Sequence, residues 1–267
     1  MQSLLDLERY PLDELHGAGG ESLVQGCRGA LAEHGMFDLE GFVRPGALAE
    51  CVAEIAPVVE ADAFVHRRSH NIYFDDNIPG LDADHPALKR FDTVNHTVCA
   101  DQIPESIVCR IYKWPPLVEF LATVMGKTRL YPMADSLACA NVLTYRDGEA
   151  LNWHFDRSEF TTTLLLQTAE AGGAFQYRPD LRSDSDPNYD GVARLLAGRD
   201  DSVKTVSLEP GTLNVFKGKY AAHRVTPVEG PQARIVAVFS YYETPGVMFS
   251  EAERLGFYGR TETLETS

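Results

Sequence analysis

The sequence predicts a mainly β protein with flanking helices, an α+β chain whose centre is an eight-stranded jelly roll. From about Leu137 onward, short apolar runs alternate with turn signals such as Asp147-Gly148 and Pro210-Gly211. Short strands separated by turns at this spacing are typical of two facing sheets closed as a jelly roll. Before Leu137 the apolar residues recur at helical spacing, which predicts helices in the N-terminal part.

The first predicted helix covers residues 20–34. Leu23, Cys27 and Leu31 fall on one helical face, and Gly35 follows as a stop signal. This spacing predicts an amphipathic helix with one apolar stripe facing a core.

The next segments are expected to be a strand, a second helix and a long loop. Residues 36–43 alternate well enough for an edge strand, and Pro45 suits the first position of a helix that continues through residues 46–64. The polar stretch 66–95 is expected to be an irregular loop, either a mobile excursion or part of a binding site. Residues 103–126 are expected to be helical again, with a break or restart at two adjacent prolines.

The strand candidates of the jelly roll follow in close succession. They cover residues 137–146, 151–155, 160–168, 173–179, 203–209, 211–218, 221–228 and 234–243. The insertion at residues 179–201 contains too many Asp, Asn and Pro residues for a strand, and its second half suits one helical turn or two. We expect a single domain over residues 1–267, made of an N-terminal part (1–136), a jelly-roll core (137–243) and a C-terminal segment (244–267).

The composition limits the class of protein. The chain has 267 residues, 44% of them hydrophobic, which suits one globular domain. Its formal net charge is −15, and because nucleic acid binding needs a basic surface, polyanionic partners are not expected. The chain has no run of about 18 apolar residues and no basic stretch before an apolar core at its N-terminus. We therefore expect neither a transmembrane helix nor a signal peptide.

The cysteines give the expected compartment. Cys27, Cys51, Cys99, Cys109 and Cys139 are odd in number, scattered, and form no CxxC pair. Buried free thiols in a reducing cytoplasm are the expectation for such a set. The sequence leaves the oligomeric state open, and a homodimer is compatible with it.

His154-Phe155-Asp156, followed by His223, is the most informative pattern in the chain. Residues i and i+2 of a strand point to the same face, so His154 and Asp156 can both face the interior of a barrel. Two imidazoles and one carboxylate can bind a divalent metal on one side, which is the signature of non-haem Fe(II) oxygenases. An HxD motif alone is also typical of a strand-end His with a turn Asp, but the downstream His223 favours a metal site.

Arg234 adds a fixed cation whose fork geometry suits a carboxylate. A hairpin between His223 and Arg234 would return the guanidinium to the metal. A metal triad with such an Arg is what a site needs to hold iron and 2-oxoglutarate together, with O2 as the further reactant. Asn141 and Tyr145 share a face of the preceding strand and would suit the carboxylates of 2-oxoglutarate, with ordinary strand packing as the alternative.

Four stretches carry a family resemblance: NWHFDRSEFTTTLLLQ, GGAFQYRPDLRS, PGTLNVFKGKYAAHRVTPVEG and RIVAVFSYYETPG. Over residues 141–242 the chain resembles the cupin-like, double-stranded β-helix Fe(II)/2-oxoglutarate oxygenases. The sequences of these stretches are similar to those of the subfamily of halogenases and hydroxylases of free amino acids, such as the lysine halogenases. The resemblance implies that His154, Asp156 and His223 bind iron and that Arg234 pairs with the distal carboxylate of 2-oxoglutarate.

Asp156 distinguishes this chain within that resemblance. In the related halogenases a Gly replaces the carboxylate ligand, and chloride takes the vacated position. The presence of Asp156 therefore predicts hydroxylation, while desaturation or cyclisation on the same site stays open.

The expected function is an Fe(II)/2-oxoglutarate-dependent dioxygenase that hydroxylates a small polar molecule, of which a free amino acid such as lysine is the favoured class. One alternative is a cupin-like binding or sensory protein with a vestigial metal site. A vestigial site would not need all four groups, and a zinc hydrolase would leave Arg234 without a purpose. The sequence does not identify the substrate or the position oxidised on it.

Several other side chains are weaker candidates. His66 and His70 could bind a second metal if the segment were helical, but no third ligand is evident. Asp135 could pair with a substrate amine, although a solvated turn residue is the favoured interpretation. Further weak candidates for substrate or co-substrate contacts are Arg90, His96, Arg157, Ser158, Glu159, Thr163, Thr226 and Ser240.

Overall fold

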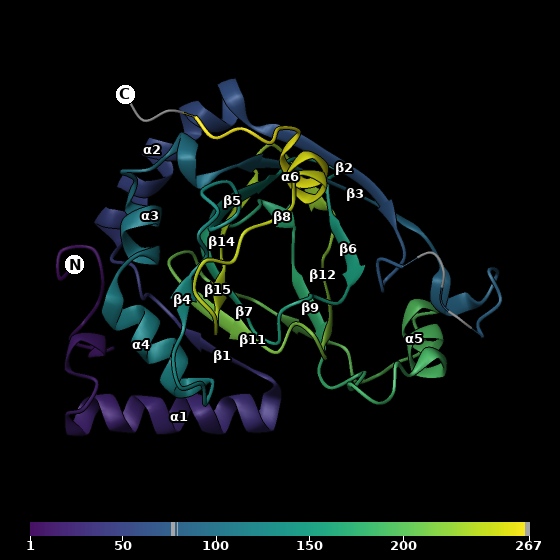
Figure 1. Ribbon diagram of the computed structural model, residues 1–267, viewed down its shortest axis with the longest axis horizontal. Helices are drawn as coiled ribbons and strands as arrows, with labels where there is room; N and C mark the ends of the chain where they lie inside the picture. Colours follow the sequence, from purple (N-terminus) through teal and green to yellow (C-terminus); the bar gives the residue numbers. More distant parts are fainter. Residues whose placement is uncertain (76–77, 79, 265–267) are drawn as a thin grey trace.

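Two facing β-sheets form the centre of the molecule, and helices cover the outer face of the larger one (Figure 1). The structure is a computed structural model that describes residues 1–75, 78 and 80–264. The seven-stranded sheet has the order β1 (Met36–Leu39), β11 (Leu213–Phe216), β7 (Thr161–Gln167), β14 (Arg234–Phe239), β5 (Ala140–Tyr145), β3 (Phe91–Val98) and β2 (Phe64–His70). The four-stranded sheet has the order β10 (Lys204–Val206), β9 (Phe175–Arg178), β12 (Ala222–Val225) and β6 (Leu151–His154).

Smaller elements complete the architecture. Two further two-stranded sheets pair β13 (Val228–Glu229) with β8 (Ala171–Gly172) and β15 (Tyr241–Tyr242) with β4 (Tyr131–Pro132). The helices are α1 (Ala18–His34), α2 (Pro45–Asp62), α3 (Ile107–Tyr112), α4 (Pro115–Val124), α5 (Tyr189–Leu196) and α6 (Glu251–Tyr258). None of the helices in the described part of the chain is long and apolar enough to cross a membrane.

The predicted jelly roll is confirmed. The strand candidates divide equally between the sheets, with β5, β7, β11 and β14 in the larger one and β6, β9, β10 and β12 in the smaller one. The predicted helices at the N-terminus also form, and the expected edge strand is β1 at one margin of the larger sheet. The insertion after β9 contains α5, in agreement with the predicted helical turns.

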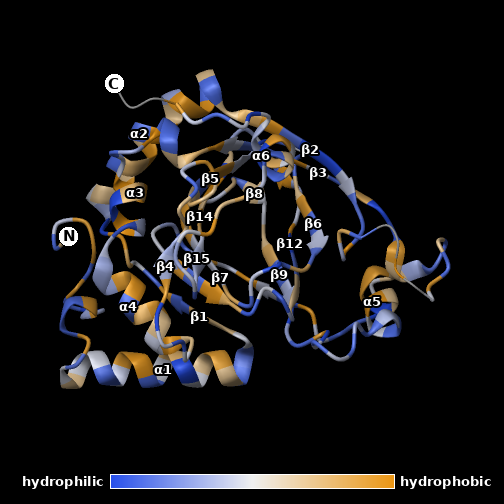
Figure 2. Ribbon diagram, in the orientation of Figure 1, coloured by the Kyte–Doolittle hydropathy of each residue, from blue (hydrophilic) through white to orange (hydrophobic). Residues whose placement is uncertain are grey.

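The polar stretch 66–95 is not a continuous loop, so that expectation was wrong. β2 pairs with β3 in a regular antiparallel ladder from Phe64↔Thr97 to His70↔Phe91. Polar residues occupy both faces of this ladder, which removes the apolar alternation that normally indicates a strand. In Figure 2 the far end of β2 is accordingly blue. Residues 76, 77 and 79 of the predicted loop lie outside the described residues, as do residues 265–267 of the C-terminal segment.

Burial of apolar faces joins the helices to the larger sheet. The main core runs from Leu4 to Tyr258 and includes Leu31 of α1, Ile55 of α2 and Phe120 of α4, each at most 4% exposed. Complete burial of one large apolar side chain stabilises a fold by about 1.5–3 kcal/mol. The contacts between these helices and the larger sheet therefore stabilise the sheet that carries Arg234 and Tyr145.

Asp135 anchors the C-terminal segment to the barrel. Its side chain is 0% exposed and forms an ion pair with Arg254 of α6 at 2.8 Å. The same carboxylate accepts hydrogen bonds from the backbone N–H groups of Leu137 and Phe249. Asp135 is therefore neither a solvated turn residue nor available to a substrate amine, and the expectation for it was wrong.

Replacement of Asp135 by Ala should lower the free energy of unfolding by about 3 kcal/mol, because it leaves the Arg254 charge and two backbone donors without their partner. Urea denaturation of both proteins measures this difference. Lys219→Ala, which removes an exposed partner of Asp184, is the control and should change stability little. A loss in Asp135→Ala no larger than in the control would show that α6 does not depend on this pair.

Candidate metal centre

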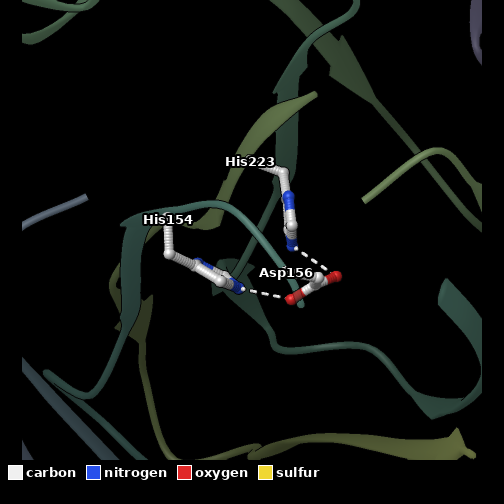
Figure 3. A group of neighbouring side chains, drawn as sticks. All are labelled: His154, Asp156 and His223. Atoms are coloured by element: carbon white, nitrogen blue, oxygen red, sulfur yellow. Dashed lines mark ion pairs between the residues drawn. The ribbon is translucent and has the colours of Figure 1, made fainter. Parts of the chain in front are cut away.

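The two site histidines come from neighbouring strands of the smaller sheet. β12 pairs with β6 so that His223 lies directly opposite His154. Directly opposed residues of an antiparallel pair project from the same face, and here the two ring centroids are 4.1 Å apart. Figure 3 shows both imidazoles converging on Asp156.

Asp156 completes the cluster from the loop that follows β6. Its backbone N–H donates to the Gly218 carbonyl at 3.0 Å, which holds the end of β6 beside the loop before β12. Oδ1 lies 3.5 Å from His154 Nε2, and Oδ2 lies 3.3 Å from His223 Nε2. One ligand atom from each of the three residues falls within 4.8 Å of the others, so a single ion can contact all three.

Backbone carbonyls fix the orientation of both imidazoles. His154 Nδ1 lies 2.8 Å from the Asn152 carbonyl, and His223 Nδ1 lies 2.9 Å from the Ala221 carbonyl. A carbonyl can only accept, so each Nδ1 carries the proton and each Nε2 keeps its lone pair for a metal. Both Nε2 atoms are the ones that face Asp156.

The protonation states of the cluster also favour a cation. Burial is the main cause that lowers the pKa of His154, and the neighbouring His223 adds to it. Burial tends to raise the pKa of Asp156, but the two histidines outweigh it and hold that pKa well below the usual range. A neutral imidazole and an ionised carboxylate are the forms that bind metal.

The donor set fits the expected ion. Within the described ranges, this is the one group of at least three His, Cys, Asp or Glu side chains arranged to hold a metal. Two imidazoles and one carboxylate match the facial triad of non-haem Fe(II), while structural zinc sites are usually closed by four ligands.

Arg234 lies on the inner face of the larger sheet, directly opposite Tyr145 in the β14–β5 ladder. It is 6% exposed, and its Nε donates to the Gly173 carbonyl at 3.0 Å. Its Nη1 is buried and has no hydrogen-bond partner among the described residues. A buried guanidinium nitrogen without an acceptor is costly, so Nη1 fits a carboxylate of 2-oxoglutarate.

Tyr145 connects Arg234 with the metal cluster. Burial raises the pKa of its phenol, the Arg234 charge lowers it, and the Asp156 charge raises it again. The geometric relation is that Tyr145 lies directly opposite Arg234 in the β14–β5 ladder. A role for Tyr145 beside the co-substrate stays a prediction.

Asn141 shares the face of Tyr145 but already has partners. Its amide nitrogen donates to the Leu137 carbonyl at 2.6 Å, and its Oδ1 accepts from the Tyr258 hydroxyl at 3.0 Å. These bonds tie β5 to α6, so the amide supports the barrel wall. Direct binding of 2-oxoglutarate by Asn141 stays a prediction.

The weaker candidates are placed as follows. His66 and His70 lie on β2, not on a helix, and His70 contacts Thr93 and the Asn71 carbonyl through its two ring nitrogens. Burial lowers the pKa of His70 to about 4, so it is neutral. His96 pairs with Glu149 at 3.0 Å, which gives it a structural partner.

Three residues near the cluster were not anticipated. Thr161 donates a hydrogen bond from its hydroxyl to Asp156 Oδ2, and Gly218 packs directly against the same carboxylate. The Phe74 ring lies edge-on to His154, with the centroids 5.8 Å apart, and its backbone is left-handed at a φ of 55°. The sequence gives no signal for Gly218 or Phe74, because both are distant in sequence from the residues that they contact and only the folded chain brings them together.

The chain belongs to the Halogenase D family, whose model matches residues 20–248. No curated protein is similar enough in sequence to count as a relative.

Solved structures share the fold at low identity. An oxidoreductase of the 2OG-Fe(II) oxygenase family from Burkholderia pseudomallei is 14% identical with a TM-score of 0.52, covering 84% of this chain and 92% of its own. The carbocyclase SnoK from nogalamycin biosynthesis is 14% identical with a TM-score of 0.57, covering 92% and 95%. The epimerase SnoN, solved with Fe3+, α-ketoglutarate and nogalamycin RO, is 13% identical with a TM-score of 0.53, covering 83% and 84%.

Family, fold and donor set together place the chain among the iron- and 2-oxoglutarate-dependent oxygenases. The predicted double-stranded β-helix core and enzyme class are confirmed at this level. The identities are too low to transfer a substrate or a reaction from any of these structures.

His154→Ala and His223→Ala should each abolish binding of a divalent ion with the fold retained, because each removes one of three protein ligands. Isothermal titration with Co(II) measures the binding, and far-UV circular dichroism checks the fold. His96→Ala, a buried histidine outside the cluster, is the control and should bind Co(II) as the wild type does. Retention of normal Co(II) affinity in either ligand variant would refute the ligand assignment.

Proposed function

We propose that this enzyme hydroxylates an unactivated C–H bond of a small polar molecule, with a free amino acid such as lysine as the favoured substrate class. The single observation that supports hydroxylation is the Asp156 carboxylate, which lies within 3.5 Å of both site histidines. When bound, iron with 2-oxoglutarate and O2 supplies the oxidising power, and 2-oxoglutarate leaves as succinate and CO2.

The residues of the site have distinct proposed roles. His154, Asp156 and His223 hold the ion, and the Nδ1 hydrogen bonds of both histidines keep their Nε2 atoms aimed at it. Arg234 binds the distal carboxylate of 2-oxoglutarate through its unpartnered Nη1, and Tyr145 lies beside that pair.

Halogenation is the competing reaction that the family name suggests. A halide needs a coordination position that no protein ligand fills. In this chain the Asp156 carboxylate stands in that place, with Thr161 and Gly218 packed against it. A binding protein with a vestigial metal site is also disfavoured. Such a protein would not need to keep all three residues of the triad together with Arg234.

The proposed location is the cytoplasm. The described cysteines are all free and buried, which suits a reducing compartment. Burial raises the pKa of the Cys51 and Cys99 thiols to about 12, so these side chains behave as apolar packing groups.

Arg234→Lys should raise the 2-oxoglutarate concentration needed for half-maximal turnover by about tenfold or more, because Lys keeps the charge but loses the planar fork. Coupled succinate formation measures this, and Co(II) titration should show unchanged metal binding. Arg224→Lys is the control, since Arg224 lies over the Trp153 ring and bonds Gln176, away from the cluster. An unchanged requirement for 2-oxoglutarate in Arg234→Lys would place the distal carboxylate elsewhere.

Asp156→Gly should remove hydroxylation largely or entirely and open one position on the metal to chloride or water. We do not expect efficient chlorination from this change alone, because the outcome also depends on where neighbouring contacts hold the substrate. In the wild type, chloride should be neither needed nor incorporated. Mass spectrometry of product formed with amino acid substrates in the presence of chloride tests both statements. A chlorinated product from the wild type would overturn the hydroxylase proposal.

A further inference from the structure

The Asp156 carboxylate is held from one side by Thr161, the first residue of β7. The Thr161 hydroxyl donates to Asp156 Oδ2. Pairing of β7 with β11 sets Thr161 opposite Phe216, so the chain that leaves β11 passes beside the same carboxylate. The hydroxyl is therefore placed by the sheet, whereas Asp156 lies in the loop that follows β6.

Gly218 packs against the same oxygen of the carboxylate, beside the Thr161 hydroxyl. A Cβ at this position would collide with Asp156 Oδ2 and with Thr161 Oγ1, so any larger residue would have to displace them. The Gly218 carbonyl also accepts the Asp156 N–H at 3.0 Å. Close backbone approach to a functional group is a common reason for glycine at a site.

We infer that Thr161 is a positioning residue that makes Asp156 bind the metal through Oδ1 alone. This inference rests on the proposed iron site. A hydroxyl hydrogen on Oδ2 occupies one lone pair of that oxygen and weakens it as a metal donor, while Oδ1 has no such competitor among the described residues.

Binding through one oxygen matters because the coordination positions are few. An octahedral ion offers about six positions, and the triad takes three of them if each residue gives one atom. 2-Oxoglutarate and O2 would need the remaining positions. A carboxylate that bound through both oxygens would take one of these, so the hydrogen bond from Thr161 would keep that position available.

Thr161→Val is the direct test, because it removes the donor while keeping a β-branched side chain on the strand. Thr161→Ser is the matched control, since it retains the hydroxyl. The readout is the water-proton relaxivity per bound Mn(II), measured without 2-oxoglutarate, which reports the number of water molecules on the ion. We expect the Ser variant to equal the wild type and the Val variant to fall by about one third, as a second carboxylate oxygen displaces one water.

Turnover gives a second readout that a purely structural role would not move. Thr161→Val should lower kcat/KM for O2, while the KM for 2-oxoglutarate and the melting temperature stay near the wild-type values. Thr161→Ser should keep kcat/KM for O2 near that of the wild type.

The outcomes separate this inference from the proposed function. If the wild type binds Mn(II) and the His154→Ala variant does not, the metal site stands. An unchanged relaxivity per bound ion in Thr161→Val, whatever its affinity, would then overturn the role of Thr161 alone. Failure of the wild type to bind the ion would overturn the iron site and, with it, this inference.

Discussion

The register between β6 and β12 is the constraint on which the site depends. His154 and His223 oppose each other in that ladder, so both imidazoles leave the same face of the smaller sheet. A slip of one residue would turn one imidazole outward, because successive strand residues alternate in direction. The carbonyls of Asn152 and Ala221 then select the Nδ1–H tautomer. One backbone register therefore sets both the position and the protonation of two ligands.

The larger sheet contributes a different part of the same site. Its inner face carries Arg234 and Tyr145 in direct register, and Thr161 at the start of β7 reaches the Asp156 carboxylate. The proposed metal ligands thus come from the smaller sheet and the loop beyond it, whereas Arg234, the proposed cation for 2-oxoglutarate, comes from the larger one. Helices pack against the outer face of the larger sheet and bury its apolar side chains (Figure 1).

Much of this arrangement could be predicted from the sequence because it follows local periodicity. The alternation of apolar residues identified the strands, and the i, i+2 spacing of His154 and Asp156 predicted that both face the interior. β2 and β3 were missed because their polar residues occupy both faces. Gly218 could not be anticipated, since its proximity to Asp156 arises from the packing of two loops distant in sequence. Asp135 was misjudged because burial depends on α6, which follows more than a hundred residues later.

The Asp156 position also bears on the choice between halogenation and the hydroxylation that we propose. The scaffold, the two imidazoles and the Arg234 cation would be equally useful to a halogenase, and the matching family model is that of Halogenase D. The difference lies in the space occupied by Asp156, which Thr161 and Gly218 line closely. A Gly at position 156 would leave that space lined by a free hydroxyl and a backbone that admits no side chain, and such a void can accept an anion. In the proposed hydroxylase, Asp156 thus denies a halide its position on the metal, while the contacts that hold the substrate still decide which group would be transferred once that position is open.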